Sequence, residues 1–399
     1  YRMDPDRIDE IHEVALGESC PYCSGAVGSV ERVDQIIEEL PEIRPRVVQL
    51  ITYKGRCTSC RRIVRTHHPL QVSHAQGCAR VQLGRRASSL VLELQHRYGL
   101  TKRKVSRLLK EVMGLSLSPG GVVQLSHRMA EKLTGEYEKL IQSARQSAYI
   151  HSDETSWYVG GPKYWLWVFT NEELTLYRVD KSRGRKVVHQ VLGEQYQGVL
   201  VTDCLNVYDD ASPIQHKCYA HHLKELSRLT EVSGKDPPSA YLLKWKQLLR
   251  VAMLLKERKI HISEQRFVNH CLLLAAKADE LLAHTREDPL EEAFANRIRK
   301  QRDHLFTFLF YDPVDPTNNL AERQLRPAVI ARKVSCGNRT EKGANSWQIL
   351  ASIAATTQQL QQDFYQKVNL AIRQHLNTLK ANEALPGEGP LDLNRFSLI

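Results

Sequence analysis

Three acidic residues occupy sequence positions at which carboxylates could bind metal ions. Asp153 ends the stretch Ser-Ala-Tyr-Ile-His-Ser, and Asp203 ends Gly-Val-Leu-Val-Thr, so each is expected to follow a strand directly. Glu322 lies far downstream in Thr-Asn-Asn-Leu-Ala-Glu-Arg, a helix-like context. Carboxylate oxygens are the ligands that Mg²⁺ prefers, and paired ions stabilise the attacking and leaving oxygens of a phosphoryl displacement. If the three residues converge, metal-dependent phosphoryl transfer becomes possible.

The elements around the two aspartates follow a recognisable order. The patterns predict strands over 164–169 and 174–179, a helix over 186–192, and a strand over 199–201. Three meander strands, a helix and a further strand form the order of ribonuclease-H-like nucleotidyl transferases, in which the first and fourth strands are neighbours. We therefore expect Asp153 and Asp203 to lie close together.

Other interpretations of these carboxylates remain open at this point. A single aspartate after an apolar run is often only a strand-end cap or a turn residue. Glu154, Asp209 and Asp210 are rival candidates, and we rank them lower because they are expected to fall beyond the apolar strands.

The chain between Asp203 and Glu322 is longer than a minimal ribonuclease-H core requires. Apolar residues recur there at helical spacing, which predicts a helical insertion over 233–310. They are Leu242, Trp245, Leu249, Ala252 and Leu255, followed by Leu274, Ala278, Leu281 and Leu282. The insertion could shield DNA or make dimer contacts, and the sequence does not decide between these roles.

Two Cys-x-x-Cys pairs near the N-terminus have the spacing of metal ligands. Cys20 with Cys23, and Cys57 with Cys60, could supply four thiolates to one structural Zn²⁺ ion. A strand predicted over 47–53 between the pairs would complete a zinc ribbon. The alternatives are four incidental thiols or a redox pair.

A basic helical stretch follows the cysteines. Leu90, Leu92, Leu94 and Tyr98 could form the apolar face of a helix that ends at Gly99. Thr101 is a predicted N-cap for residues 102–110, and Ser118 with Pro119 opens a third helix. Three short helices fit a helix-turn-helix DNA-binding region. The expected DNA contacts are Arg103, Lys104, Arg107 and Lys110; the alternative is a solvated face of a small bundle.

Composition narrows the class of protein. The 399 residues are 42% hydrophobic, an ordinary value for a globular protein, and no apolar run is long enough to cross a membrane. Lys and Arg number 56 against 45 Asp and Glu, which favours an anionic partner such as nucleic acid. We expect a cytoplasmic protein without membrane contact that associates with the nucleoid when bound to DNA.

At several motifs the chain resembles transposases of the IS66 family, from the zinc motif to about residue 375. The matching motifs are Cys20-Pro-Tyr-Cys23 with Cys57-Thr-Ser-Cys60, His151-Ser-Asp-Glu-Thr155, Val201-Thr-Asp203, Cys218-Tyr-Ala-His221, and Asn318-Asn-Leu-Ala-Glu-Arg323 followed by Leu325-Arg-Pro327. The resemblance implies a DDE triad at Asp153, Asp203 and Glu322, with zinc-finger and helix-turn-helix regions upstream. One departure is that His222-Leu-Lys-Glu replaces the basic residues that usually follow the Cys-x-x-His motif.

Two further groups of residues complete the expected site. His221 could contact the scissile phosphate or orient a ligand; a second metal site or a core histidine are the alternatives. With one Cys-x-x-His pair, a separate zinc site would lack ligands. Basic residues near Glu322 are expected to hold DNA: Arg323, Arg326, Arg332, Lys333 and Arg339.

The resulting expectation is a multidomain α+β protein. It combines a zinc ribbon, a helix-turn-helix helical domain and a ribonuclease-H-like α/β catalytic core with a helical insertion. The expected segments are a lead-in (1–18), a zinc-binding domain (19–80), a helical DNA-binding region (81–147), the core in two parts (148–232 and 311–382) around the insertion (233–310), and a flexible tail (383–399).

The expected activity is that of a Mg²⁺-dependent (or Mn²⁺-dependent) nucleotidyltransferase and endonuclease. It would bind the terminal repeats of an insertion sequence, cleave them and join them to target DNA. A homodimer on paired ends is expected because two ends must be joined, and accessory proteins of the same element could take part. The alternatives are a catalytically silent, transposase-derived DNA-binding regulator or scaffold, and a metal nuclease without strand transfer.

Overall fold

The computed structural model describes residues 8–66, 68, 70–71 and 82–383, so most of the expected tail lies outside the described residues. The chain forms two compact units, Tyr1–Arg44 and Pro45–Ile399. The described part of the first unit contains no helix and no extended strand. A single bridge between Ser19 and Ala26 closes a turn around the first cysteine pair.

The second unit begins with a small antiparallel hairpin. Strands β1 (Lys54–Arg56) and β2 (Ile63–Arg65) flank the turn that carries the second cysteine pair. The strand predicted over 47–53 is wrong, because those residues form neither strand nor helix. Val47, Ile51 and Tyr53 are exposed, and in the described part of the chain only Tyr53, at the end of the run, bonds to the hairpin, through Thr66 at 2.9 Å.

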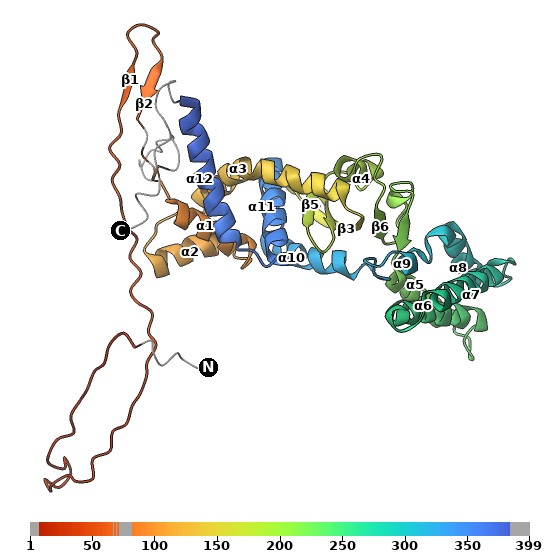
Figure 1. Ribbon diagram of the computed structural model, residues 1–399, viewed down its shortest axis with the longest axis horizontal. Coiled ribbons are helices and arrows are strands. Elements are labelled where there is room, and N and C mark those ends of the chain that lie inside the picture. Colours follow the sequence, from red (N-terminus) through yellow and green to blue (C-terminus); the bar gives the residue numbers. More distant parts are fainter. Residues whose placement is uncertain (1–7, 67, 69, 72–81, 384–399) are drawn as a thin grey trace. The chain divides into compact units, whose positions relative to one another are not determined.

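A five-stranded mixed sheet forms the centre of the second unit (Figure 1). Its strands lie in the order β5-β4-β3-β6-β7. Their bounds are β3 Tyr149–Tyr158, β4 Lys163–Thr170, β5 Thr175–Asp180, β6 Val199–Thr202 and β7 Gln215–Lys217. β3 pairs antiparallel with β4 and parallel with β6, as expected. The predicted meander and the helix after it, α4 (Arg185–Leu192), are confirmed.

Alternation along β4 distributes side chains to the two faces of this sheet. Trp167 and Phe169 join a hydrophobic cluster with α4 and helix α3 (Pro119–Gln146) on one face. Leu166 and Val168 join another cluster with helix α10 (Asn319–Ser335) on the opposite face. The sheet is therefore covered on both sides, and most of its apolar side chains are buried.

The basic helices pack into the same core as the sheet. They are α1 (Arg85–His96), α2 (Lys102–Met113) and α3 (Pro119–Gln146). The Thr101 and Ser118 caps are confirmed, since their hydroxyls accept the N–H groups of Lys104 and Gly121. The third helix is much longer than expected because apolar residues continue along it to Tyr137 and Ala144. Tyr98 was assigned wrongly to the apolar face, since it is exposed.

The segment between Asp203 and Glu322 is helical, as predicted. It contains α5 (Tyr219–Ser233), α6 (Ala240–Arg258), α7 (Glu264–Leu282), α8 (Pro289–Lys300), α9 (Thr307–Phe310) and the short 3-10 helices η1 (Asn206–Tyr208), η2 (Lys259–His261) and η3 (Arg302–His304). The predicted apolar residues are buried, with Leu282 partly so, and they share a cluster with Val199 and Val201 of β6. The insertion therefore packs against the strand that precedes Asp203.

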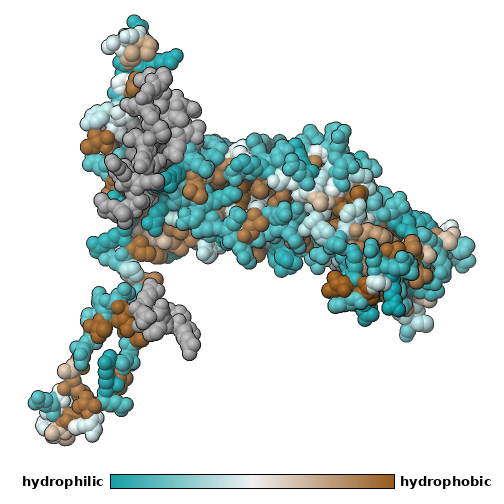
Figure 2. Space-filling model, in the orientation of Figure 1, coloured by the Kyte–Doolittle hydropathy of each residue, from teal (hydrophilic) through white to brown (hydrophobic). Residues whose placement is uncertain are grey.

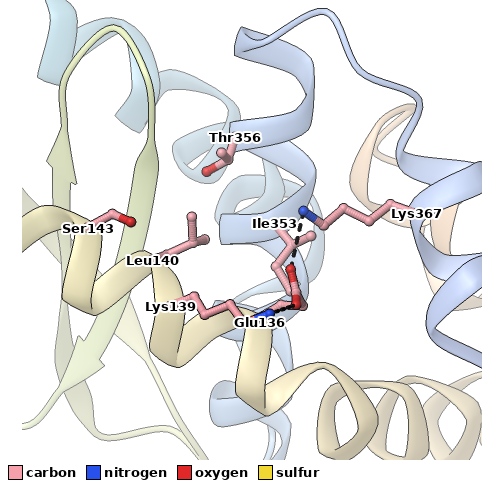
Figure 3. A pocket seen from close by; sticks show the side chains of 7 residues that line it. All are labelled: Glu136, Lys139, Leu140, Ser143, Ile353, Thr356 and Lys367. Carbon is pink, nitrogen blue, oxygen red and sulfur yellow. Dashed lines mark hydrogen bonds and ion pairs between the residues drawn. The ribbon is translucent and has the colours of Figure 1, made fainter. Parts of the chain in front are cut away.

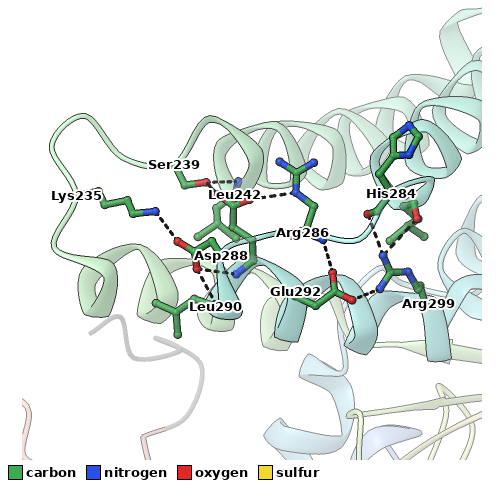
Figure 4. A network of polar contacts seen from close by, with 11 residues as sticks. Lys235, Ser239, Leu242, His284, Arg286, Asp288, Leu290, Glu292 and Arg299 are labelled. Carbon is green, nitrogen blue, oxygen red and sulfur yellow. Dashed lines mark hydrogen bonds and ion pairs between the residues drawn. The ribbon is translucent and has the colours of Figure 1, made fainter.

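Polar contacts fix the loops of the insertion (Figure 4). Asp288 caps α8 and pairs with Lys235, which lies between α5 and α6. Arg299 donates to Glu292 at 2.6 Å and to the carbonyl of His284 at 3.1 Å. Several apolar side chains on α6 and α7 stay exposed, and Figure 2 shows brown patches on this part of the surface. They are Leu243, Val251, Leu254, Val268, Leu272 and Leu273.

Three helices close the structure: α10 (Asn319–Ser335), α11 (Glu341–Gln359) and α12 (Phe364–Glu383). α10 lies across β3 and β4, while α11 packs against β5 and α3. A shallow hollow lies between α3 and the C-terminal helices, where Glu136 pairs with Lys139 and Lys367 (Figure 3). None of the predicted site residues lines this hollow. In the described part of the chain, no helix combines the length and apolar character needed to cross a membrane.

Candidate active site

Strand pairing brings together the segments that carry the two predicted aspartates. In the parallel pair of β3 and β6, the last paired residues are His151 and Val201, each two residues before an aspartate. β6 ends at Thr202, so Asp203 follows it directly, and the charge of Asp203 acts on Asp153. Glu322 lies in the first turn of α10, which packs against β3. The three predicted carboxylates therefore come from adjoining elements.

The reason given for ranking Glu154 below Asp153 is wrong. β3 does not stop at Asp153 but continues to Tyr158, so Glu154 lies within the strand. Neighbouring side chains of a strand point to opposite faces. Glu154 is buried beneath Tyr208 and Arg183, with contacts of 2.6 Å and 2.8 Å. The pleat of the strand, and not its end, separates the two carboxylates.

The rival carboxylates are paired with cations of the protein. Glu154 lies 2.8 Å from Arg183, Asp209 lies 2.9 Å from Lys300, and Asp210 lies 3.2 Å from Arg185. By contrast, within the described residues no ion-pair partner lies beside any member of the predicted triad. No ion pair within these residues therefore neutralises the triad, although the charge of Asp203 acts on the nearby Lys217.

Burial and nearby negative charges make Asp153 hard to ionise. Burial, with smaller contributions from the charges of Glu154, Asp203 and Glu322, raises the pKa of Asp153 to about 7. The N–H of Glu154 donates to Asp153 Oδ1 at 2.8 Å, and the N–H of Leu205 donates to Asp203 Oδ1 at 2.9 Å. These bonds fix the orientation of both carboxylates. Their oxygens form a hard donor set, which suits Mg²⁺.

Asn318 is a site residue whose role the sequence did not reveal. Its side chain is fully buried, donates to the carbonyl of Ser152 at 2.9 Å and lies 3.0 Å from His151 Nδ1. Its backbone N–H donates to Cys218 Sγ at 3.1 Å. Asn318 therefore joins the start of α10 to β3 and α5, one turn before Glu322. In the sequence, Asn318 was marked only by its place in the motif that contains Glu322.

Arg332 holds the other end of α10 against the same strand. Its guanidinium donates to the hydroxyls of Thr155 and Ser156 at 3.1 Å and 2.6 Å and to the carbonyl of Ser156. A fully buried lysine, Lys217, lies near Asp203 and donates to the hydroxyl of Thr202 at 3.3 Å. No sequence pattern indicated that Lys217 would be buried.

His221 belongs to a compact group of possible metal ligands. Ligand atoms of Cys218, His221 and Glu322 all lie within 4.8 Å of one another. Cys218 is buried, His221 is half-buried and Glu322 is exposed. Among the described residues, no other group of three His, Cys, Asp or Glu side chains lies this close together. Asp153 and Asp203 are not part of the group.

Comparison with protein-family models decides the family. The model described as Transposase IS66 family matches residues 80–346, about two thirds of the chain. The chain belongs to the IS66 family of transposases. A search of curated protein sequences found no significant match. The matched region of this transposase includes the three carboxylates and the Cys-x-x-His motif, whereas both Cys-x-x-Cys pairs precede it.

The basic residues predicted to bind DNA are mostly exposed in this transposase. Arg332 is the exception, because β3 occupies its guanidinium. The exposed residues are Arg103, Lys104, Arg107, Lys110, Arg323, Arg326, Lys333 and Arg339. Arg339 lies close enough to Lys102 at the start of α2 to help lower its pKa, after the larger effect of burial. The two predicted basic groups thus approach each other near Lys102.

Each cysteine pair of the transposase has the local geometry of a thiolate site. Backbone N–H groups of Tyr22 and Cys23 lower the pKa of Cys20, and those of Cys60 and Ser59 lower the pKa of Cys57. Such N–H groups favour the thiolate form, which binds metal. Zinc binding by the four cysteines stays a prediction that this local geometry favours.

Proposed function

We propose that this transposase cleaves the ends of an insertion sequence and joins them to target DNA with a DDE triad of Asp153, Asp203 and Glu322. One observation carries the proposal: within the described residues the three neighbouring carboxylates form no ion pair with the protein, while their rivals Glu154 and Asp209 do. Keeping such a set unpaired is unfavourable unless a cation binds there. The sheet order matches the one expected for a ribonuclease-H-like core, which supports the same proposal.

The carboxylates would hold two Mg²⁺ ions, or Mn²⁺ in their place. When bound, such ions stabilise negative charge on the attacking and leaving oxygens of a phosphodiester. The protein's own contribution is orientation: backbone N–H groups fix Asp153 and Asp203, and Asn318 fixes the helix that carries Glu322. Hydrolysis would leave a 3′-hydroxyl on the cleaved strand. That hydroxyl would then displace a 3′ oxygen of the target strand in a transesterification.

DNA binding would use the exposed basic residues on two sides of Lys102. Residues on α2 (Arg103, Lys104, Arg107, Lys110) would act as the helix-turn-helix contacts. Those on and after α10 (Arg323, Arg326, Lys333, Arg339) would hold the cleaved end near the carboxylates. A homodimer on paired ends, a role for accessory proteins and association with the nucleoid follow from the reaction. The zinc-binding cysteines would stabilise the N-terminal part.

Cleavage of an end-containing DNA duplex tests this function. Wild type with Mg²⁺ should produce a 3′-hydroxyl end, and Glu322→Gln should bind the duplex without cutting it. Glu322 is exposed, so this replacement is not expected to disturb folding. Cutting by both proteins would refute the triad. Binding without any cutting by wild type, also with Mn²⁺ and the element's accessory proteins, would favour a silent regulator or scaffold.

A further inference from the structure

Glu322 could bind a metal ion together with either of two sets of residues. One set is Asp153 and Asp203, whose charges act on the same carboxylate cluster. The other set is Cys218 and His221, whose ligand atoms lie within 4.8 Å of a Glu322 oxygen. A Glu322 carboxylate bound to an ion at Cys218 and His221 would be less free to bind an ion at Asp153 and Asp203. The partners also differ in kind, since the first set offers oxygen and the second offers sulfur and nitrogen.

The ligand chemistry of the second set selects a different metal from the first. Thiolate and imidazole ligands favour zinc and similar transition ions, whereas Mg²⁺ takes oxygen ligands in octahedral geometry. One Cys, one His and one Glu would give three protein ligands, a number found in zinc sites that keep a fourth position open. A separate zinc site seemed to lack ligands in the sequence; Glu322, from a distant segment, supplies the third.

The surroundings of Cys218 and His221, the two residues of the Cys-x-x-His motif, also fit a metal. Cys218 Sγ accepts the N–H of Asn318 at 3.1 Å, which leaves the sulfur oriented by a donor and open to a further ligand. His221 Nδ1 is buried and has no hydrogen-bond partner among the described residues. A buried ring nitrogen without a partner is unfavourable. Coordination of a metal ion by the imidazole of His221 would offset part of this unfavourable energy.

We infer that Cys218, His221 and Glu322 form a site for a zinc-class ion, and that zinc bound there inhibits DNA cleavage by withdrawing Glu322 from Asp153 and Asp203. On binding, Zn²⁺ replaces the thiol proton of Cys218, which passes to solvent, and the imidazole and carboxylate each contribute a lone pair. The inhibition rests on the proposed cleavage function; the binding site does not. Zinc and magnesium would then compete for one carboxylate.

Metal content of the full-length protein tests the site directly. After incubation with Zn²⁺ and gel filtration, wild type should hold about one zinc ion per chain more than Cys218→Ser. His221→Gln and Glu322→Gln should show the same loss, and the exposed position of Glu322 keeps that variant informative if the others fail to fold. Cys271→Ser, a change at a buried cysteine of α7, is the matched control and should keep the full zinc content.

Cobalt substitution identifies the ligands without any activity. Co²⁺-loaded wild type minus Co²⁺-loaded Cys218→Ser should show a sulfur-to-cobalt charge-transfer band, while the same subtraction with Cys271→Ser should be flat. Losing a ligand should weaken binding by more than about 100-fold, since losing only a hydrogen-bond partner of a ligand costs about 10–100-fold. Equal zinc content and identical spectra in wild type and Cys218→Ser would overturn the site.

Zinc inhibition is then measured as a ratio of cleavage rates with and without zinc at constant Mg²⁺. In wild type the ratio should fall at least about tenfold below one, as expected when a metal ligand is lost from the reaction centre. In Cys218→Ser it should stay near one, whatever the variant's own rate. A wild-type ratio near one at saturating zinc would refute the inhibition. If wild type cuts no DNA under any condition, the proposed function fails, and the zinc content and cobalt spectra still decide the site.

Discussion

Replacing Asp153 by Asn should abolish cleavage and yet make the metal-free protein more stable at neutral and alkaline pH. Asn keeps the oxygen that accepts the N–H of Glu154 at 2.8 Å, so the local hydrogen bond survives. What the replacement removes is a carboxylate that burial and nearby negative charges disfavour. The site would thus be functional and locally unstable for the same physical reason.

The size and pH range of the effect follow from the pKa of Asp153. Its folded-state pKa is about 7, against an ordinary value of 3.8. The folded protein therefore holds this proton more tightly than the unfolded chain, and stability is lost as pH rises from about 4 to about 7. A difference of about three pKa units at about 1.4 kcal/mol each sets an upper bound of about 4 kcal/mol. Allowing for relaxation, we expect Asn to recover about 2 kcal/mol or more above pH 7.

Thermal unfolding of metal-free wild type and Asp153→Asn at several pH values measures this effect. The variant should unfold several degrees higher at pH 8, with the difference vanishing near pH 4. Adding Mg²⁺ should stabilise wild type and leave the variant unchanged, because only wild type keeps the full ligand set. Equal unfolding temperatures at pH 8, or a variant that is less stable there, would refute the reasoning.

The adjacent residue, Glu154, supplies a control for this effect. Glu154→Gln replaces a carboxylate that accepts from Tyr208 and pairs with Arg183. Burial raises the pKa of Glu154 as well, but these two contacts lower it and offset part of the effect. Glu154→Gln should therefore gain less stability at pH 8 than Asp153→Asn, because it also loses a buried charge-assisted contact. An equal or larger gain in Glu154→Gln would contradict this.

Three further outcomes are expected. Asn318→Ala should destabilise the protein by about 2–4 kcal/mol and reduce cleavage, because it leaves buried polar groups on β3 unpaired. Unfolding and cleavage assays check this. The same change at the exposed neighbour, Asn319→Ala, should show neither effect. Arg332→Gln should reduce cleavage with little change in DNA affinity, because the guanidinium of Arg332 bonds to β3. Arg326→Gln should instead weaken DNA binding in gel-shift titrations at fixed salt. The reverse pattern would contradict the contact between Arg332 and β3. Cys57→Ser should release zinc from the N-terminal site, and unchanged zinc by elemental analysis would refute the four-cysteine assignment.

Local patterns in the sequence were sufficient where the interactions are local. The caps at Thr101 and Ser118 depend on residues three positions apart, and the strands of the meander show continuous apolar runs. The insertion was predictable because its buried residues keep helical spacing around Trp245. In each of these places the stabilising contacts lie within one element or its neighbour.

Prediction failed where burial depends on distant segments. β3 carries the polar residues His151, Ser152 and Glu154 in its interior, and each is buried because a partner arrives from another part of the chain. Sequence periodicity cannot reveal such a strand, so its end was placed too early. The run over 47–53 shows the reverse error, since its apolar residues form no strand.

The chain segment between β7 and α10 begins and ends at neighbouring points, so its length need not affect the position of Glu322. The Tyr219 N–H donates to the carbonyl of Pro316 at 2.9 Å, and the Asn318 N–H reaches Cys218 at 3.1 Å, so the chain departs and returns at one point. The entropy of closing a loop grows only logarithmically, at about 0.6 kcal/mol per doubling of length. The segment from α6 to α9 should therefore be replaceable: it could be lengthened, shortened or exchanged without moving Glu322, provided that His221 on α5 is kept and that the new segment still covers Val199 and Val201.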